Sequence, residues 1–240
     1  MNTRFNPTAN GQLHLGHLYL ILVNHKTAKD SQGQFVVRFD DDQPYWIESI
    51  GRPAIAANCQ SIIEDLDWMG IVVDRYSYQS QERELNEEFI RSLSGVRSLS
   101  VAGYGLPPVI ISCDRPYPYV PYLTAIKVAQ DYREQIDCVI RGDDLICEFS
   151  LYCYFCERLN IPIPKFYYVP KLLHLGEDLT DVSKTRGNFK IRDLRALGFT
   201  PPTIESMLAE ACLKEVSRGW VFDNIKQVPA LTSTECAQWV

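Results

Sequence analysis

The chain has 240 residues, with 24 basic side chains against 30 acidic ones and a formal net charge of −6. Nonspecific nucleic-acid binding rests on many phosphate contacts, so this balance argues against a general polyanion binder, although it is compatible with a local basic patch. Hydrophobic residues make up 46% of the chain, which argues against disorder and allows a sizeable core.

The eight cysteines, with no signal peptide recognisable before them, favour a reducing, cytoplasmic setting over a disulfide scaffold. Cys153 and Cys156 form a C-x2-C pair, but no second pair or nearby histidine completes a zinc site. Their surroundings are typical of an amphipathic helix, so we expect both to pack as small apolar side chains. No apolar run reaches the roughly 20 residues needed to cross a membrane, so we expect no membrane partner.

The first half of the chain alternates β-branched and aromatic segments with longer segments whose apolar residues recur at helical spacing. This alternation favours an α/β fold with a doubly wound parallel sheet and crossover helices. The expected strands cover residues 3–7, 34–40 and 71–79, and the expected helices cover residues 14–30, 50–70 and 81–95.

Residues 95–120 break this rhythm, because glycines and prolines cluster there and predict a compact insertion or an irregular connection. The alternation then resumes and ends in a tail that contains proline and threonine. The expected order is a helix over 124–135, a strand over 137–144, a helix over 146–160, an extended segment over 165–175, a polar loop over 176–188 and a helix over 203–216.

The stretch GQLHLGH, residues 11–17, joins the first strand to the first helix. In an open parallel sheet, ligands bind beyond the carboxyl ends of the strands, and a helix N-terminus offers free N–H groups to phosphates. Gly16 would let an adenine or ribose approach the backbone, and the His14 and His17 imidazoles would donate to phosphate oxygens as charge develops. Alone, so short a motif is also what a helix with two incidental histidines would show.

A second motif, VSKTRGN, covers residues 182–188 in the polar loop. Lys184 carries a compact charge on a flexible stem, which suits a transient bond to a polyphosphate. A solvated surface loop is the alternative. The order of the two motifs favours the first interpretation, because one follows the first strand and the other follows the last expected strand of the same sheet.

Four segments in order, RFNPTANGQLHLGH, RFDDDQP, VIRGDDL and DVSKTRGN, resemble the signature blocks of the class I glutamyl- and glutaminyl-tRNA synthetases. The first is similar to Arg-Phe-x-Pro followed by His-x-Gly-His, the third to Arg-Gly-Glu-Asp and the fourth to the Lys-Met-Ser-Lys-Ser loop. The tetrad YQSQ, residues 78–81, falls where many members have a similar one. The resemblance extends over roughly residues 3–200 and implies a Rossmann-like catalytic domain.

For the amino acid, the resemblance implies that Arg4 faces the side-chain carboxylate or amide, with Asn6 and Thr8 in the same pocket. A guanidinium fork suits a carboxylate because it binds both oxygens. Asp40 would hold the α-ammonium group and Arg141 would contact the amino acid. Without the resemblance, Asp40 is equally typical of a solvated strand end.

The tyrosine that closes over the amino acid in this family corresponds to Tyr122 after a one-residue shift, or to Leu123 without one. For ATP, the resemblance implies that Gly142 and Asp143 lie against the ribose or adenine. Taken alone, Arg141 and Asp143 are also typical of a structural ion pair.

The chemistry implied is adenylation by positioning and charge stabilisation, with no covalent enzyme intermediate. His14, His17 and Lys184 would stabilise the α-phosphate and the departing pyrophosphate. Mg²⁺ would arrive with ATP through its phosphates, and no metal site made by the protein alone is expected. The remaining residues of the expected ATP site are Thr8, Gly16, Val182 and Ser183.

The chain also departs from the family pattern. Asp181 replaces the first lysine of the mobile loop and should weaken the local attraction for triphosphate, and Val182 replaces a methionine or leucine. The short Asp40 in RFDDDQP is nearer the glutaminyl form, whereas Arg4 and Arg141 favour glutamate. The choice between glutamate and glutamine therefore stays open.

We expect a catalytic domain over residues 1–200 with a reduced insertion at about 82–125, a helical segment and tail over 201–240, and no anticodon-binding domain. This organisation resembles the stand-alone catalytic paralogues of the glutamyl-queuosine type. Those paralogues carry a cysteine-rich zinc site in the insertion, where this chain has only Cys113, so no zinc is expected.

Three hypotheses follow. The chain activates glutamate, or a close analogue, as an adenylate and transfers it to a tRNA or tRNA-like acceptor. Alternatively, the acceptor is a small-molecule or protein amine, which the acidic charge and the short insertion favour. The third hypothesis is a catalytically silent paralogue with a binding or regulatory role, supported by Asp181 but opposed by the intact His14, His17 and Lys184. The oligomeric state is left open.

Overall fold

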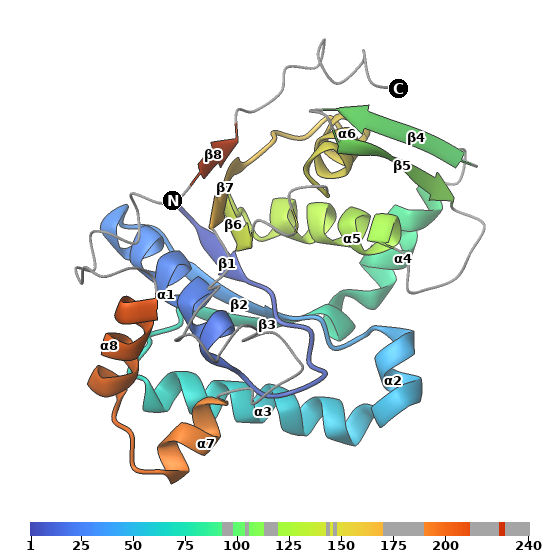
Figure 1. The fold of residues 1–240 in the computed structure, drawn as a ribbon. Coiled ribbons are helices and arrows are strands. Elements are labelled where there is room, and N and C mark those ends of the chain that lie inside the picture. The colour runs from blue at the N-terminus through green and yellow to red at the C-terminus, as the bar shows by residue number, and fades with distance from the viewer. Residues whose placement is uncertain are drawn as a thin grey trace.

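A six-stranded sheet lies at the centre of the described part of the chain (Figure 1). The computed structural model describes residues 1–92, 98–103, 106–112, 120–142, 145, 148–169, 190–211 and 226–228. Neighbouring strands follow the order β3-β2-β1-β6-β7-β8, and only the last pair is antiparallel. The strands are β1 (Thr3–Phe5), β2 (Phe35–Phe39), β3 (Arg75–Tyr78), β6 (Cys138–Gly142), β7 (Lys165–Val169) and β8 (Lys226–Val228). The doubly wound, Rossmann-like α/β fold is therefore confirmed.

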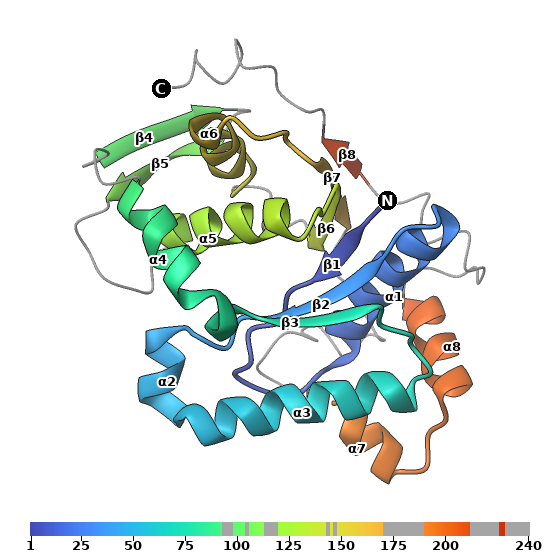
Figure 2. The ribbon, with the colours of Figure 1, turned by 180° about the vertical axis from the view of Figure 1, so that it is seen from behind.

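Helices cover both faces of this sheet (Figures 1 and 2). One core contains buried side chains of α1, α3, α7 and α8, and the other contains those of α5 and α6. The pleat divides β2 between them, because Phe35, Val37 and Phe39 join the first core and Val36 joins the second. The helices are α1 (Leu15–Asp30), α2 (Pro44–Ile50), α3 (Arg52–Trp68), the 3₁₀ turn η1 (Gln79–Glu82), α4 (Arg83–Ser92), α5 (Val120–Arg133), α6 (Phe149–Leu159), α7 (Ile191–Ala196) and α8 (Pro201–Ala211).

Most expected elements are present, and the structure adds a hairpin and three short elements. Residues 98–103 and 106–112 form an antiparallel hairpin of β4 (Ser98–Gly103) and β5 (Leu106–Ser112), so the alternative of an irregular connection is wrong for these residues, whereas the compact insertion stays a prediction. The flanking glycines and prolines concealed the apolar runs of these strands. The short elements α2, α7 and β8 were also not expected from the sequence.

Cys153 and Cys156 confirm the expected packing role, because both are buried in the core beneath α6. Among the described residues, no helix is long and apolar enough to cross a membrane.

The sheet topology places a ligand site at one edge. From β1 the chain winds outward through β2 and β3, then returns to β6 on the other side of β1 and continues to β7. The direction of winding reverses between β1 and β6, and ligands of such folds bind beyond the carboxyl ends of the strands at this reversal. The residues that follow β1, β2 and β6 therefore define the candidate site.

Candidate active site

The structure brings the expected amino-acid-binding residues to this edge. Arg4 lies in β1, Asp40 follows β2 and Arg141 lies in β6. All three act electrostatically on the half-buried Lys127 of α5, which faces the same edge. Their convergence follows from the parallel strands, whose carboxyl ends meet at one side of the sheet.

Arg4 is 4% exposed and forms a bidentate pair with Asp131 of α5. Its Nε lies 3.1 Å from Asp131 Oδ1, and its Nη2 lies 3.2 Å from Asp131 Oδ2. Two of the three guanidinium nitrogens therefore bind a carboxylate of the protein. The expected contact of Arg4 with a substrate side chain stays a prediction, and only part of the fork is available for it.

Sequence reasoning missed Arg38, which lies in β2. Its side chain connects the ends of β1 and β2 to α5. Its guanidinium is fully buried and donates to Asp131 at 2.7 Å, Glu134 at 2.9 Å and Asn6 Oδ1 at 2.8 Å. Burial opposes its charge, but the carboxylates of Asp131 and Glu134 outweigh burial and raise the pKa of Arg38. Arg38 therefore stays a cation that fixes Asn6 in the expected pocket.

Asn6, which Arg38 holds in place, in turn orients the carboxylate of Asp40. The Asn6 amide donates to Asp40 Oδ1 at 2.5 Å, and Gln43 Nε2 donates to Asp40 Oδ2 at 3.4 Å. Thr8 is bridged to Asp40 through the backbone, which fixes the strand end that carries the carboxylate. Burial raises the pKa of Asp40, against the opposing effects of Lys127, Asn6 and Arg38. An incoming ammonium group would therefore be attracted to a carboxylate that has little contact with water.

Arg141 is held by a partner that the sequence did not indicate. Its Nη2 donates to Glu148 Oε2 at 2.5 Å, and the arginine is 4% exposed. Lys127 lies within the influence of Glu148, Asp40, Arg141 and Arg4, and burial lowers the pKa of Lys127 against the attraction of the two carboxylates. The site thus contains an additional amine beside the carboxylate expected to hold an α-ammonium group.

The HLGH segment forms the start of α1. His14 is the N-cap residue, and its Nδ1 accepts from the backbone N–H of His17 at 3.4 Å. The two imidazole rings stack with centroids 3.7 Å apart and planes inclined by 23°. A Cβ at Gly16 would lie 3.2 Å from His14 Cε1 and Nδ1, so the glycine leaves room for this ring. The glycine thus has a packing reason besides the expected approach of ATP.

Lys190 and Ile191, which follow the expected lysine loop, contact the HLGH segment and the residue before it. His14 and Lys190 form an antiparallel bridge, and the Ile191 N–H donates to the Leu13 carbonyl at 3.0 Å. The segment 182–188 therefore ends two residues before the contact with HLGH. Asp181, Val182, Ser183 and Lys184 themselves lie outside the described residues, as do Cys113 and Asp143.

Tyr122 lies in the first turn of α5, and its side chain is outside the described part of the structure. The next residue, Leu123, is half-buried in the same turn. Gly142 ends β6, at the edge where the ligand is expected. The assignment of the closing tyrosine thus stays a prediction.

Sequence reasoning missed the polar face of α5. Lys127, Asp131 and Glu134 follow one another at intervals of four and three residues, which places them on one side of a helix. Asp131 and Glu134 are 1% and 6% exposed. The signal was available in TAIKVAQDYRE, where charged side chains at helical spacing interrupt an otherwise apolar segment.

Substituting Gly16 with alanine is expected to lower activity without unfolding the protein. The new Cβ must displace the His14 ring, while alanine favours a helix by about 1 kcal/mol over glycine. We expect the free energy of unfolding to stay within about 1 kcal/mol of wild type and adenylation to fall about tenfold, as measured by urea unfolding and ATP–pyrophosphate exchange. Gly11→Ala is the matched control, because nothing lies within 4 Å of its added Cβ. Equal rates for both variants would contradict this role of Gly16.

Comparison with known protein families agrees with this arrangement. Residues 1–94 match the family model of tRNA synthetases class I (E and Q), catalytic domain. The match includes β1, the HLGH segment, Asp40 and the YQSQ tetrad. It ends before α5, β6 and the lysine loop.

Curated relatives extend the similarity at low identity. The glutamate–tRNA ligase of Aquifex aeolicus is 23% identical over 332 aligned residues, which cover all of this chain and 66% of that protein. The glutamate–tRNA ligase of Pyrococcus furiosus is 35% identical over 91 residues, 38% of this chain and 15% of that protein. The chain thus spans less than two thirds of the length of these relatives.

Solved structures confirm the fold. A glutamate-tRNA synthetase from Elizabethkingia anophelis superposes with a TM-score of 0.60 at 16% identity, covering 100% of this chain and 69% of that one. The tyrosyl-tRNA synthetase from Aeropyrum pernix gives a TM-score of 0.59 at 15% identity over 79% of this chain and 58% of that one. Because synthetases for two different amino acids fit almost equally well, the fold does not identify the amino acid.

Proposed function

We propose that this protein activates glutamate, or a close analogue such as glutamine, as an aminoacyl-adenylate with ATP and transfers it to a tRNA or tRNA-like acceptor. The observation that carries the proposal is the convergence of Arg4, Asp40 and Arg141 at the sheet edge where β1 leads into the HLGH helix start. An amino-acid pocket and a phosphate site would then adjoin each other.

Each group has a defined part in this reaction. Asp40 would hold the α-ammonium group, Arg141 would contact the amino acid and Arg4 would orient its side chain. A carboxylate oxygen of the substrate attacks the α-phosphorus, a P–O bond forms, and the bond to pyrophosphate breaks. The imidazoles of His14 and His17 would donate to the phosphate oxygens in the transition state.

The ATP would lie along the HLGH backbone, with Thr8, Gly16, Gly142 and Asp143 around the nucleoside and Val182, Ser183 and Lys184 over the phosphates. Mg²⁺ would enter with the ATP phosphates. The bridge from His14 to Lys190 supports the place of Lys184, because it brings the end of its loop to the phosphate side.

The second candidate has the same adenylation with a small-molecule or protein amine as acceptor. The net charge of −6 supports it, because tRNA binding relies on contacts to many phosphates.

The proposal also includes a cytoplasmic location, a catalytic domain over residues 1–200 with a segment over 201–240, and the stand-alone paralogue type.

Amino-acid-dependent ATP–pyrophosphate exchange tests the proposal. We expect exchange with glutamate or glutamine in a survey of the common amino acids, with and without total tRNA. Lys184→Ala should reduce the rate at least about tenfold, because it removes a charge from the leaving pyrophosphate. No exchange with any amino acid or tRNA would overturn adenylation, and full exchange by Lys184→Ala would overturn the role of the loop.

A further inference from the structure

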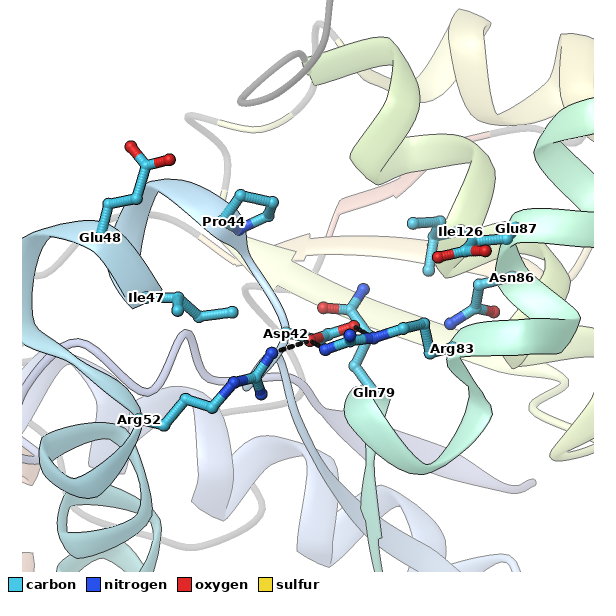
Figure 3. A pocket seen from close by; sticks show the side chains of 10 residues that line it. All are labelled: Asp42, Pro44, Ile47, Glu48, Arg52, Gln79, Arg83, Asn86, Glu87 and Ile126. Atoms are coloured by element: carbon cyan, nitrogen blue, oxygen red, sulfur yellow. Dashed lines mark hydrogen bonds and ion pairs between the residues drawn. The ribbon is translucent and has the colours of Figure 1, made fainter.

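A cavity of about 330 Å³ lies between α2, η1, α4 and α5 (Figure 3). Pro44 and Ile126 provide apolar walls on opposite sides of it. Cavities of this size hold small molecules of drug-like dimensions. The YQSQ tetrad, which the proposed adenylation does not use, provides its floor through Gln79.

Gln79 is buried without using its amide. It is 2% exposed, and neither its Oε1 nor its Nε2 is hydrogen-bonded to any described residue. Figure 3 shows the amide in the middle of the lining side chains, above the pair of Asp42 and Arg83. A buried amide without hydrogen bonds is costly and calls for an explanation, and a ligand with a donor and an acceptor side by side would satisfy both atoms.

The charges of the cavity favour a cation. Asp42 accepts from Arg83 Nε at 2.7 Å and from Arg52 Nη2 at 3.3 Å, so both guanidiniums are bound to one carboxylate. Glu48 and Glu87 also line the cavity, which gives three carboxylates against two guanidiniums. This excess of negative charge opposes a phosphate and attracts an ammonium group.

Residues of the cavity are sequence neighbours of residues that act on Asp40. Asp42 and Pro44 flank Gln43, whose amide donates to Asp40. On the other side, Ile126 of the wall precedes Lys127, which acts on the same carboxylate. In both segments, a residue that lines the cavity is thus the direct sequence neighbour of a residue that acts on Asp40.

We propose that this cavity binds the acceptor, and that the acceptor is a small molecule with a primary amine and a carboxamide-like group on an apolar body. This inference rests on the proposed adenylation and on the second candidate for its acceptor, a small-molecule amine. The bound ammonium group first releases a proton to solvent, and the neutral amine nitrogen then attacks the carbonyl carbon of the adenylate, so that a C–N bond forms and the C–O bond to AMP breaks. AMP leaves with the electron pair, and the nitrogen of the new amide releases a second proton to solvent.

L-leucinamide is a suitable probe, because it combines an ammonium group, a carboxamide and a branched apolar body. We expect saturable binding to the full chain without ATP, measured by titration calorimetry. Binding should weaken about tenfold or more for 4-methylpentanamide, which lacks the amine, and for isoamylamine, which lacks the amide. With ATP and glutamate, mass spectrometry should detect glutamyl-leucinamide.

Gln79→Leu is the decisive variant. It should weaken leucinamide binding about tenfold or more. Its unfolding temperature should equal or exceed that of wild type, because leucine has a similar volume and no unsatisfied polar atoms. Gln81→Leu is the matched control, since Gln81 is exposed on the same 3₁₀ turn, and should bind leucinamide as wild type does.

No saturable binding of leucinamide, or undiminished binding to Gln79→Leu, would overturn the assignment of the cavity. Saturable binding of the trinucleotide CCA, in the absence of any leucinamide binding, would overturn it in favour of a nucleic-acid acceptor. ATP–pyrophosphate exchange on the same preparations separates the two proposals. Exchange without leucinamide binding removes the cavity assignment alone, whereas binding without exchange removes the acceptor role together with the proposed adenylation.

Discussion

Replacing Asp131 with alanine is expected to lower the free energy of unfolding by about 3–5 kcal/mol, because a buried charge that loses its partner is strongly destabilising. Asp131 binds the guanidiniums of Arg4 and Arg38, which are 4% and 0% exposed, and accepts from the Tyr152 hydroxyl at 2.8 Å. Glu134 still pairs with Arg38, but Arg4 has no other carboxylate partner within 4 Å among the described residues.

Urea unfolding at pH 7 measures this loss. Asp30→Ala is the matched control, since Asp30 is exposed and pairs with Lys26 one turn earlier on α1. An exposed pair of this kind contributes about 0.5 kcal/mol or less. Similar losses for the two variants would show that the buried pairs do not stabilise the fold.

Asp131 also makes the stability of the wild-type protein depend on pH in the acid range. Burial opposes the charge of Asp131, but Arg4 and Arg38 outweigh burial and lower the pKa of Asp131 from 3.8 to about 2. A lowered pKa contributes stability that is fully present above the unfolded value of 3.8 and is lost as the pH falls toward 2. We expect about 2 kcal/mol of stability to disappear across this window in wild type and not in Asp131→Asn.

The positions of the residues at strand ends could be predicted from the sequence, whereas the partners of the polar residues on α5 could not. Arg4, Asp40 and Arg141 each belong to a short motif in a strand or directly after one, and parallel strands bring such positions together. Asp131 meets Arg4 across 127 residues of sequence, on a helix whose periodicity is mostly apolar. A helical pattern identifies a buried face but does not indicate which arginines that face will meet.

In the segment RFDDDQP too, the sequence alone does not indicate which partner each side chain meets. Asp40 accepts from the Asn6 amide in the proposed amino-acid pocket, Asp41 accepts from the Ser80 N–H at 2.8 Å, and Asp42 binds Arg83 beside the further cavity. Three identical side chains thus point to three different environments, because the chain leaves β2 and turns into α2 at this place. Sequence identified the carboxylates, but only the path of the backbone separates their roles.

His17→Ala is expected to reduce the kcat of ATP–pyrophosphate exchange about 10²–10³-fold while changing the KM for ATP little. In the proposed reaction, the His17 imidazole donates to phosphate oxygens whose charge grows in the transition state, so its loss affects the rate more than substrate binding. Steady-state exchange at varied ATP concentration separates kcat from KM.

The neighbouring histidine should behave differently. His14 is the N-cap of α1 and accepts from the His17 N–H, so His14→Ala should lose about 1 kcal/mol of stability in addition to activity. His25, on the same helix, packs its ring against Phe35 at the opposite end of the strands, and His25→Ala should keep the wild-type exchange rate. This series separates helix capping from catalysis.

A raised KM with unchanged kcat in His17→Ala would place the imidazole in ground-state binding of ATP and contradict the proposed role. Equal rate losses in His17→Ala and His25→Ala would attribute the effect to the stability of α1. Loss of kcat in His17→Ala alone, with wild-type unfolding, would mean that the stacked imidazoles at the start of α1 act on the reacting phosphate. That outcome would also count against a catalytically silent paralogue, because a helix start retained only for folding needs the cap at His14 and not the ring of His17.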